Sequence, residues 1–241
     1  MLIDENTTFI VQGITGREAV NLTRECLDYG SKVVGGVTPG RKGREVHGVP
    51  VFDSVKQLCE ELGYVPDVIK MGGIGGPALD AAKAYTPGNV GVISRSGGMT
   101  TEMSSTLKAA GLGQSTAVSI GGDAIIGSTY AELMPLFEAD AQTEAIVIYT
   151  EPGGRMEAQL AAWVTEHRSR LPIVAFMAGR FMDEMPGMSF GHAGTIVEGR
   201  EDTATEKIAR LAAAGITVAE RIEDIPDLVK QGIAERKGAT V

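Results

Sequence analysis

Short apolar stretches alternate with amphipathic segments along most of the chain. Apolar runs of about four to eight residues are typical of buried parallel strands, and the helices that cover such a sheet carry apolar residues every three to four positions. The alternation therefore predicts an α/β fold. In the first part of the chain it predicts strands at residues 8–12 and 32–37, an extended segment at 49–52, and helices at 18–27 and 54–62.

The second part of the chain repeats the pattern more fully. It predicts strands at residues 90–94, 117–120, 145–149, 173–177 and 216–218, separated by helices near 100–110, 129–138, 155–168 and 203–213. Strands joined by helices in this way form a doubly wound parallel sheet. A last helix at 225–235 should pack beside the sheet, and the tail at 236–241 should be loose.

A domain boundary is expected near residue 86. The glycines at 71–76 break regular structure, residues 78–85 are suited to a short helix, and Thr86-Pro87-Gly88 follows them. We therefore expect one domain at residues 1–86 and a second at 87–241.

Composition and charge exclude several classes of function. A net charge of −9 argues against a nucleic-acid partner, because binding a polyanion needs clustered Lys and Arg. No apolar run reaches the length of a membrane span, and the N-terminus lacks the basic and apolar regions of a secretory leader. We expect a cytoplasmic protein with no membrane partner. Cys26 and Cys59 are expected to be free, buried thiols, and no metal site is expected.

The loops that follow the strands carry the candidate chemistry, since ligands of open α/β sheets bind beyond the carboxyl ends of the strands. Ser96, Gly97 and Gly98 open a predicted helix, so their free N–H groups and the helix dipole suit an anion. Arg95 offers a planar fork for a carboxylate or phosphate. A capped tight turn with a solvated arginine explains the same residues equally well.

Two further loops contain glycines and one acid each. Gly122 and Asp123 follow the next strand, where the glycine permits close approach of a ligand. A tight turn accounts for this glycine equally well. Glu151 follows the third strand and is placed to accept a proton from one nitrogen of an imidazole. An acid at a helix start is more often only a partner of the helix dipole.

The histidine at position 192 is the candidate nucleophile. It stands in Met188-Ser189-Phe190-Gly191-His192-Ala193-Gly194-Thr195, where small neighbours leave the ring uncovered. Since an imidazole titrates near neutrality, a neutral fraction is available to attack phosphorus and form a phosphoramidate. The competing interpretation is a histidine in an ordinary turn or on a solvated surface.

Six ordered motifs together resemble the superfamily of nucleoside-diphosphate-forming acid–CoA ligases, which includes the α subunit of succinyl-CoA synthetase and ATP-citrate lyase. The motifs are Gly13-Ile14-Thr15-Gly16, Gly35-Gly36-Val37-Thr38-Pro39-Gly40, Ser94-Arg95-Ser96-Gly97, Gly121-Gly122-Asp123, Glu151 with Gly153-Gly154, and Gly191-His192-Ala193-Gly194. The resemblance spans nearly the whole chain. It implies a Rossmann-like CoA-binding domain followed by a flavodoxin-like, doubly wound ligase domain.

The resemblance also implies roles for individual residues. His192 would be phosphorylated by ATP or GTP, with Mg²⁺, on a β subunit that carries an ATP-grasp nucleotide site, in an αβ or α2β2 assembly. The phosphoryl group would pass to a small carboxylic acid, and coenzyme A would attack the acyl phosphate. Glu151 would orient His192, Arg95 would hold the acid, and Ser96, Gly97, Gly98, Gly122 and Asp123 would bind phosphate or substrate. Coenzyme A would be bound by Gly13, Thr15, Gly16, Arg17, Thr38, Pro39, Arg41 and Lys42.

The chain departs from the family pattern between Pro66 and Met71. Family members continue there through further strands and helices, and a βαβ unit needs about thirty residues that this chain lacks. By resemblance only the first two strands, the turn at 13–16 and the loop at 38–42 remain. Such a half-sheet would expose an unpaired edge and an apolar face unless something covers it. Either the sequence omits an internal segment, or the chain is a shortened homologue with weakened or altered coenzyme A binding.

Two alternatives follow from the residues. By resemblance, Gly72-Gly73-Ile74-Gly75-Gly76, the Gly97-Gly98 pair and Phe190-Gly191-His192 are more similar to the citrate branch. The citrate loop itself is not reproduced, since Ile74 stands where a polar residue would help bind a hydroxy-acid. The acid is therefore left open, with succinate first and citrate or malate next. A non-catalytic CoA- or nucleotide-binding regulatory protein is the second function. The intact His192, Glu151 and Arg95 favour the enzyme, whereas the shortened first domain favours the binder.

Overall fold

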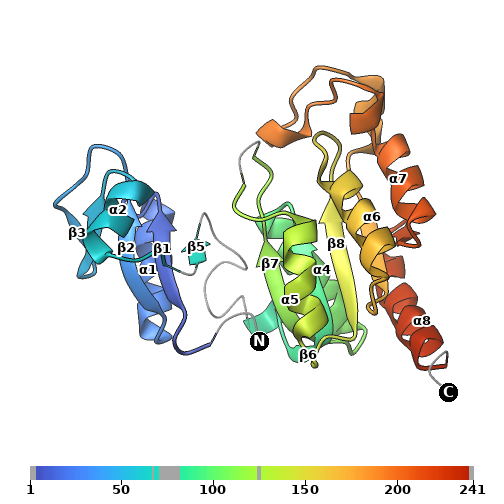
Figure 1. Ribbon diagram of the computed structural model, residues 1–241, viewed down its shortest axis with the longest axis horizontal. Coiled ribbons are helices and arrows are strands. Elements are labelled where there is room, and N and C mark those ends of the chain that lie inside the picture. Colours follow the sequence, from blue (N-terminus) through green and yellow to red (C-terminus); the bar gives the residue numbers. More distant parts are fainter. Residues whose placement is uncertain (1–3, 67, 71–81, 124–125, 239–241) are drawn as a thin grey trace. The chain divides into compact units, whose positions relative to one another are not determined.

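The computed structural model describes residues 4–66, 68–70, 82–123 and 126–238 (Figure 1). Backbone contacts divide the chain into two compact units, with the boundary between residues 81 and 82. The predicted glycine-rich break at 71–76, the start of the predicted helix at 78–85, and residues 239–241 of the predicted tail lie outside the described residues.

The first unit contains a five-stranded sheet. Its strands are β1 (Thr8–Gln12), β2 (Lys32–Val37), β3 (Glu45–Val46), β4 (Val49–Phe52) and β5 (Val68–Lys70), and its helices are α1 (Arg17–Asp28) and α2 (Val55–Leu62). The order is β3-β4-β2-β1-β5, with β3 antiparallel to β4 and the other pairs parallel. The strands predicted at 8–12, 32–37 and 49–52 are confirmed.

The cover that such a half-sheet needs is present in this unit, both beside β1 and over the two faces. The edge of β1 is paired by β5, where Phe9 lies opposite Val68 and Ile10 opposite Ile69. Both faces of the sheet are covered, one by α1 and the other by α2. In the middle of β2, a Cβ on Gly35 would lie 2.6 Å from the Leu58 side chain, and one on Gly36 would lie 2.4 Å from that of Ile14. The two glycines therefore let the covering layers approach the sheet closely.

The second unit is a parallel sheet with helices on both faces. Its strands are β6 (Pro87–Ser94), β7 (Gln114–Ser119), β8 (Ala145–Thr150), β9 (Ile173–Met177) and β10 (Thr217–Ala219), in the order β10-β9-β8-β6-β7. All neighbouring pairs are parallel. The predicted five-stranded, doubly wound sheet is therefore confirmed, as is the α/β class.

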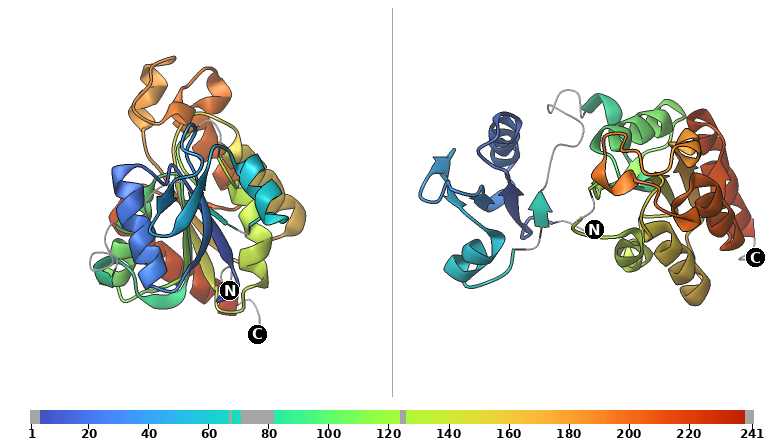
Figure 2. Two further views of the ribbon diagram at one scale, coloured as in Figure 1. Left: turned by 90° about the vertical axis from the view of Figure 1, so that its left-hand side faces the viewer. Right: turned by 90° about the horizontal axis from the view of Figure 1, so that it is seen from above.

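The helices of this unit pack on the two faces of the sheet. They are α4 (Gly97–Ala109), α5 (Tyr130–Ala139), α6 (Met156–His167), α7 (Ala204–Ala213) and α8 (Ile225–Gly238). Along β8, Ile146 and Ile148 pack with α5, α6 and α7, whereas Val147 and Tyr149 pack with α4 and α8. Figure 2, seen from above, shows the two helical layers on opposite sides of the sheet. Since side chains alternate along a strand, the fully buried β8 supplies both layers.

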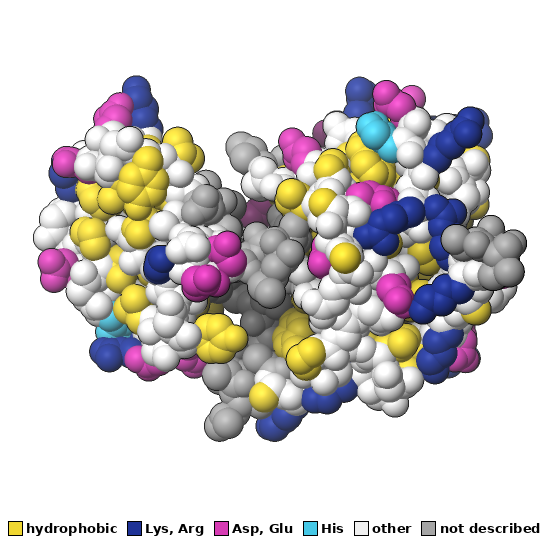
Figure 3. Space-filling model, turned by 60° about the horizontal axis from the view of Figure 1, so that its bottom comes forward, with side chains coloured by type: hydrophobic (Ala, Val, Ile, Leu, Met, Phe, Trp, Pro, Cys, Tyr) yellow, Lys and Arg dark blue, Asp and Glu magenta, His cyan; other side chains and the backbone are white. Residues whose placement is uncertain are grey.

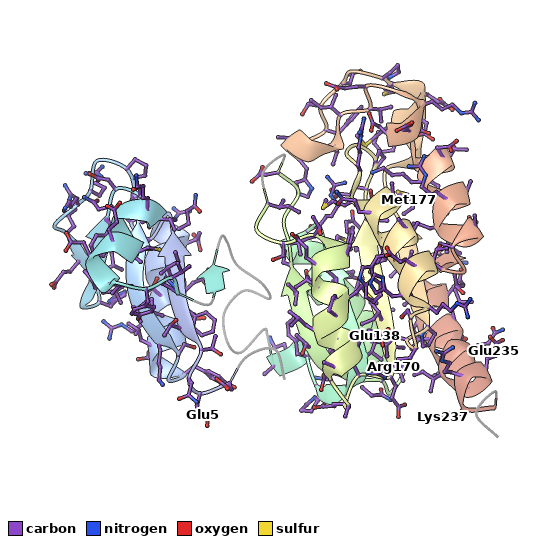
Figure 4. The ribbon with its side chains drawn as sticks, viewed as in Figure 1. Glu5, Glu138, Arg170, Met177, Glu235 and Lys237 are labelled. Atoms are coloured by element: carbon purple, nitrogen blue, oxygen red, sulfur yellow. The ribbon has the colours of Figure 1, made fainter. Side chains whose placement is uncertain are left out.

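The expectation of a loose tail is wrong for residues 236–238, which continue α8. The Arg236 guanidinium donates to the Ser169 carbonyl at 3.1 Å, and Lys237, labelled in Figure 4, pairs with Glu144 at 3.0 Å. These two contacts fix the last turn of the helix against the body of the unit.

The carboxyl ends of the five strands lie at one end of the sheet. Met177 marks this end in Figure 4, and the labelled pair of Glu138 and Arg170 marks the opposite end. The segment at 178–203, which carries three short 3-10 helices at 180–184, 193–195 and 200–202, lies over the carboxyl ends (orange in Figure 1). Any side chain on this segment is therefore brought to the strand-end loops.

Acidic and basic side chains are interspersed on the face of the second unit shown in Figure 3, without a continuous basic surface. Cys26 and Cys59 are both unpaired and half-buried. Within the described part of the chain, no helix has the length and apolar character needed to cross a membrane.

Candidate functional site

The centre of the site is a hydrogen bond between His192 and Glu151. Glu151 directly follows β8, and His192 lies in the segment above the strand ends. His192 Nδ1 is 2.8 Å from Glu151 Oε2, with the histidine side chain 40% exposed and the glutamate side chain 11% exposed. Because an ionised carboxylate only accepts hydrogen bonds, Nδ1 carries the proton. In the neutral ring the lone pair therefore resides on Nε2, and no hydrogen bond from the described residues occupies that nitrogen.

The imidazole rests directly on the backbone of Gly122. A Cβ at this position would lie 2.2 Å from His192 Nδ1 and 2.3 Å from Cγ, so only glycine leaves room for the ring. The two loops are also joined through the backbone, since the Gly194 N–H donates to the Gly122 carbonyl at 3.0 Å. The Thr195 hydroxyl closes the histidine turn by donating to the His192 carbonyl at 2.8 Å. The ring is thus seated by loops from two different strand ends.

Arg95 is a buried group that joins three loops. Its side chain is 1% exposed, and Nη1 donates to the carbonyls of Glu151, Pro152 and Gly153 at 3.1 to 3.2 Å. Nη2 donates to the Gly194 carbonyl, two residues after the histidine, at 2.9 Å. The sequence led us to expect that the Arg95 guanidinium would be open to an acid substrate. Instead, backbone carbonyls accept hydrogen bonds from both of its terminal nitrogens.

A second buried cation holds the same loop. Lys207 of α7 is 1% exposed, and its Nζ lies 2.6 Å from Glu157 Oε2, 3.1 Å from the Glu151 carbonyl and 2.5 Å from the Gly153 carbonyl. Glu157 of α6 also accepts from the Thr150 hydroxyl and lies 3.9 Å from the Arg95 guanidinium. Burial lowers the pKa of Lys207, and the charge of Glu157 opposes that shift. Each buried charge has a partner, as burial requires.

The start of α4 is the candidate anion-binding element. Ser96 caps the helix by accepting from the Met99 N–H at 3.4 Å, and the turn before it is fixed by the Ser94 hydroxyl, which donates to the Ser96 carbonyl at 2.8 Å. The N–H groups of Gly97 and Gly98 belong to the first helical turn, where no intrahelical acceptor exists. A Cβ on Gly98 would meet nothing within 4 Å, so the space beside this turn is open. Arg95 directly precedes this turn and connects it to the histidine loop.

Asp123 lies on the rim of a cavity of about 420 Å³ that adjoins the histidine loop. The cavity is also lined by Arg155 at the start of α6 and by Ala193 and Gly194 next to the histidine. The ligase-domain candidates, from Arg95 to His192, thus all lie at one end of this sheet, in loops or in the first turn of α4.

The candidate CoA-binding residues lie together in the first unit. Gly13, Thr15, Gly16 and Arg17 form the turn from β1 into α1, and Thr38, Pro39, Arg41 and Lys42 form the loop after β2. The two loops meet where the Thr15 N–H donates to the Thr38 hydroxyl at 3.4 Å. Asp53 fixes the second loop by accepting from the N–H groups of Arg41 and Lys42 at 2.9 and 3.0 Å.

The chemistry of this first-unit surface suits an anionic ligand. The N-cap Gly16 supplies no side-chain acceptor to the first turn of α1, and Gly13 has a left-handed backbone with φ of +73°. Free N–H groups at a helix start favour phosphate. Arg17, Arg41 and Lys42 are exposed and add positive charge around it.

Three residues of the ligase-domain site were not identified from the sequence, namely Tyr149, Glu157 and Lys207. A signal for Lys207 was present, because Ala204, Lys207 and Leu211 follow each other at helical spacing and all three are buried. A lysine on the apolar side of an amphipathic helix indicates a buried charge that needs a partner.

Replacing Gly122 by alanine should slow any reaction at His192 by roughly 10²-fold, because a displacement of about 1 Å has effects of that size. The added methyl group must push the ring off the backbone and away from Glu151. The matched control is Gly127→Ala in the same loop, where a Cβ meets nothing within 4 Å. The measurement is the rate of covalent phosphorylation of each variant, and equal rates for the two would contradict this seat for the ring.

Family comparisons identify both parts of the chain. The family described as CoA binding domain matches residues 4–85, and the family described as CoA-ligase matches residues 93–217. The chain is 36% identical over 287 residues to the succinate–CoA ligase [ADP-forming] subunit alpha 1 of Archaeoglobus fulgidus, covering 96% of this chain and 97% of that relative. It is 35% identical over 279 residues to the malate–CoA ligase subunit alpha of Methylorubrum extorquens, covering 91% of this chain and 93% of the relative.

Solved structures share the fold at lower identity. An ATP citrate lyase of Methanosaeta concilii in complex with (3S)-citryl-CoA superimposes with a TM-score of 0.75 at 19% identity. The superposition includes 100% of this chain and 52% of the ATP citrate lyase chain, so this chain spans about half of the length of that protein. With a relative 36% identical over nearly the whole chain and a family match across more than half of the residues, this protein belongs to the CoA-ligase family, and α subunits of succinate–CoA and malate–CoA ligases are among its relatives.

Proposed function

We propose that this chain is the α subunit of a nucleotide-dependent acid–CoA ligase and that His192 carries the phosphoryl group between the nucleotide and the acid. The observation that supports this most strongly is the Nδ1 to Glu151 hydrogen bond, which leaves the Nε2 lone pair on an accessible ring. A nucleophile oriented by a second group in this way is the general arrangement of covalent catalysis.

The proposed chemistry begins when Nε2 attacks the terminal phosphorus of a nucleotide. An N–P bond forms, the P–O bond to the nucleoside diphosphate breaks, and Glu151 stabilises the positive charge that the imidazole gains. A carboxylate oxygen of the acid then attacks the same phosphorus, which returns the electron pair to Nε2 and yields an acyl phosphate. The first turn of α4 at Ser96, Gly97 and Gly98 is proposed to bind the phosphoryl oxygens, and its place at the strand ends supports this role.

Coenzyme A supplies the thiol whose attack on the acyl phosphate gives the thioester and inorganic phosphate. The residues proposed to hold it are Gly13, Thr15, Gly16 and Arg17 on the first loop and Thr38, Pro39, Arg41 and Lys42 on the second. Their fit rests on the open first turn of α1 and on the three exposed cations around it. Both features suit the phosphate groups of such a ligand.

The nucleotide is proposed to be ATP or GTP with Mg²⁺, bound mainly by a β subunit with an ATP-grasp site, in an αβ or α2β2 assembly. The subunit names of the relatives support a partner of this kind. The sequence also contains no P-loop of the form G-x-x-x-x-G-K-[ST]. In this proposal, His192 receives its phosphoryl group from a nucleotide held by another chain.

The acid is proposed to be a small carboxylic acid, with succinate first and citrate or malate next. The names of the relatives at 34 to 36% identity support this order, since succinate–CoA ligases and a malate–CoA ligase are among them. Arg95 is reassigned in this proposal from holding the acid to holding the histidine and glutamate loops together.

The two proposed domains, at residues 1–86 and 87–241, include a shortened first domain. The alignment with the Archaeoglobus fulgidus relative supports a shortened chain. It extends over 287 positions but contains 96% of the 241 residues of this chain, which is about 231 residues. About 56 positions of that alignment therefore have no residue from this chain. This shortening also favours the second candidate function, a regulatory CoA-binding protein without turnover.

An assay of thioester formation separates the two candidates. The complex that assembles around a tagged copy of this chain in its source organism is incubated with Mg²⁺, coenzyme A, ATP or GTP, and succinate, malate or citrate in turn. We expect acyl-CoA and nucleoside diphosphate to appear in equal amounts with one of the acids. No thioester with any acid, together with retained binding of coenzyme A, would support the regulatory protein instead.

A further inference from the structure

We propose that Tyr149 is a positioning residue that fixes the Glu151 carboxylate and thereby determines which nitrogen of His192 is the nucleophile. This inference rests on the proposed function of His192. The Tyr149 hydroxyl donates to Glu151 Oε1 at 3.2 Å, while the other carboxylate oxygen, Oε2, is bonded to His192 Nδ1 at 2.8 Å. The carboxylate is thus engaged at both oxygens, by a different group at each.

The position of Tyr149 is determined by the strand that carries it. It is the penultimate residue of β8, paired with Ser94 of β6 on one side and Phe176 of β9 on the other. Its carbonyl accepts from the buried Tyr130 hydroxyl at 2.7 Å and from the Arg95 N–H at 3.3 Å. The phenol ring lies 6.2 Å from the Phe176 ring and belongs to the core under α4 and α8. A side chain fixed in this way is a rigid donor.

The spacing of the two residues explains why they meet. Tyr149 and Glu151 are two positions apart, and side chains at that spacing lie on the same side of an extended chain. The Glu151 backbone is held independently, since its carbonyl accepts from Arg95 and Lys207. With the backbone fixed by the two cations and Oε1 fixed by the phenol, only Oε2 is left to face the histidine.

The hydroxyl is also a permanent donor. Burial raises the pKa of Tyr149 well above its usual value, and the charge of Glu151 raises it further. Tyr149 therefore keeps its proton at any pH at which the protein works and always donates to the carboxylate. Since the partner of one ring nitrogen sets the protonation of the other, a fixed carboxylate keeps the proton on Nδ1 and the lone pair on Nε2.

The test is Tyr149→Phe, which keeps the ring and its packing and removes only the donor. In the tagged complex, we expect single-turnover phosphorylation of His192 to slow by about 10-fold, the size of effect that outer partners of a functional histidine have. A complex assembled with ¹⁵N-histidine in this chain alone gives the second readout. The chain has only three histidines, so the ring nitrogens of His192 can be assigned from His192→Ala.

In the wild type, the ¹⁵N shifts should show a proton on Nδ1 and none on Nε2, and in Tyr149→Phe they should show a mixture of the two tautomers. A merely structural role would slow the reaction without changing the tautomer. An unchanged tautomer, or a rate within about twofold of wild type, would overturn the proposal.

The matched control is Tyr85→Phe, whose hydroxyl contacts Thr101 at 3.2 Å, away from the histidine. It should change neither readout. Fluorescence of Trp163, the single tryptophan, reports whether the ligase domain of each variant is folded. Failure of the wild type to phosphorylate would refute the proposed function, whereas failure of Tyr149→Phe to differ from a phosphorylating wild type would refute the role of Tyr149 alone.

Discussion

Replacing His192 by alanine should abolish covalent phosphorylation of this chain and lower acyl-CoA formation by on the order of 10⁴-fold or more, as expected for removal of a nucleophile. The His192 ring is the imidazole seated on Gly122 and bonded to Glu151, and its Nε2 has no other partner among the described residues. The measurement is the transfer of labelled γ-phosphate to the chain in the tagged complex, as an acid-labile and base-stable adduct.

The other two histidines provide matched controls. His47 lies in the first unit, between the Arg24 guanidinium and the Val20 carbonyl, and His167 stacks on Trp163 with ring centroids 4.5 Å apart. His47→Ala and His167→Ala should retain the label at the wild-type level. Undiminished label in His192→Ala would refute the assignment of the nucleophile.

Replacing Glu151 by glutamine should lower the phosphorylation rate by on the order of 10³-fold, because the change removes the charge that keeps the imidazole in the reactive tautomer and stabilises its developing positive charge. The amide keeps the size of the side chain, so the seat formed by Gly122 is preserved. The measurement is single-turnover phosphorylation by rapid quench. Glu166→Gln, on the exposed side of α6, is the control and should react at the wild-type rate.

The Glu151 variant also tests the connection to Tyr149. If the phenol acts only through the carboxylate, adding Tyr149→Phe to Glu151→Gln should produce no further loss, although each change alone slows the reaction. A phosphorylation rate for Glu151→Gln within about threefold of wild type would contradict the account, since loss of a carboxylate that orients a nucleophile should lower the rate by more than that.

The parts of the fold that depend on local pattern were predictable. The strands at 8–12, 32–37, 49–52 and 173–177 were found with the observed bounds, because each is a continuous or alternating apolar run between turn residues. The strand β5 was missed, since three residues next to a glycine-rich stretch give no periodic signal. The extension of α8 through Gly238 depends on contacts with Ser169 and Glu144, which lie far away in sequence.

The residues that form the site were easier to predict from the sequence than the role of each residue. The motifs placed Gly122 and Glu151 in loops that follow two of the strands and gave Glu151 as the residue that orients His192, and these three residues do meet. The burial of Arg95 was not visible from its neighbours Ser94 and Ser96, because it arises from the Gly194 carbonyl, 99 residues later in the chain. Contacts of this kind are created by tertiary folding and leave no local pattern.

The most direct test of the central claim is to identify the phosphorylated atom. The complex, assembled with ¹⁵N-histidine in this chain, is phosphorylated with ATP and Mg²⁺ and examined for coupling between ³¹P and the ring nitrogens. The account predicts a single phosphorus bonded to Nε2 of His192, because Nδ1 is occupied by Glu151. A phosphorus on Nδ1 of His192 or on any other residue, or a protein that turns over without a phosphorylated histidine, would contradict it.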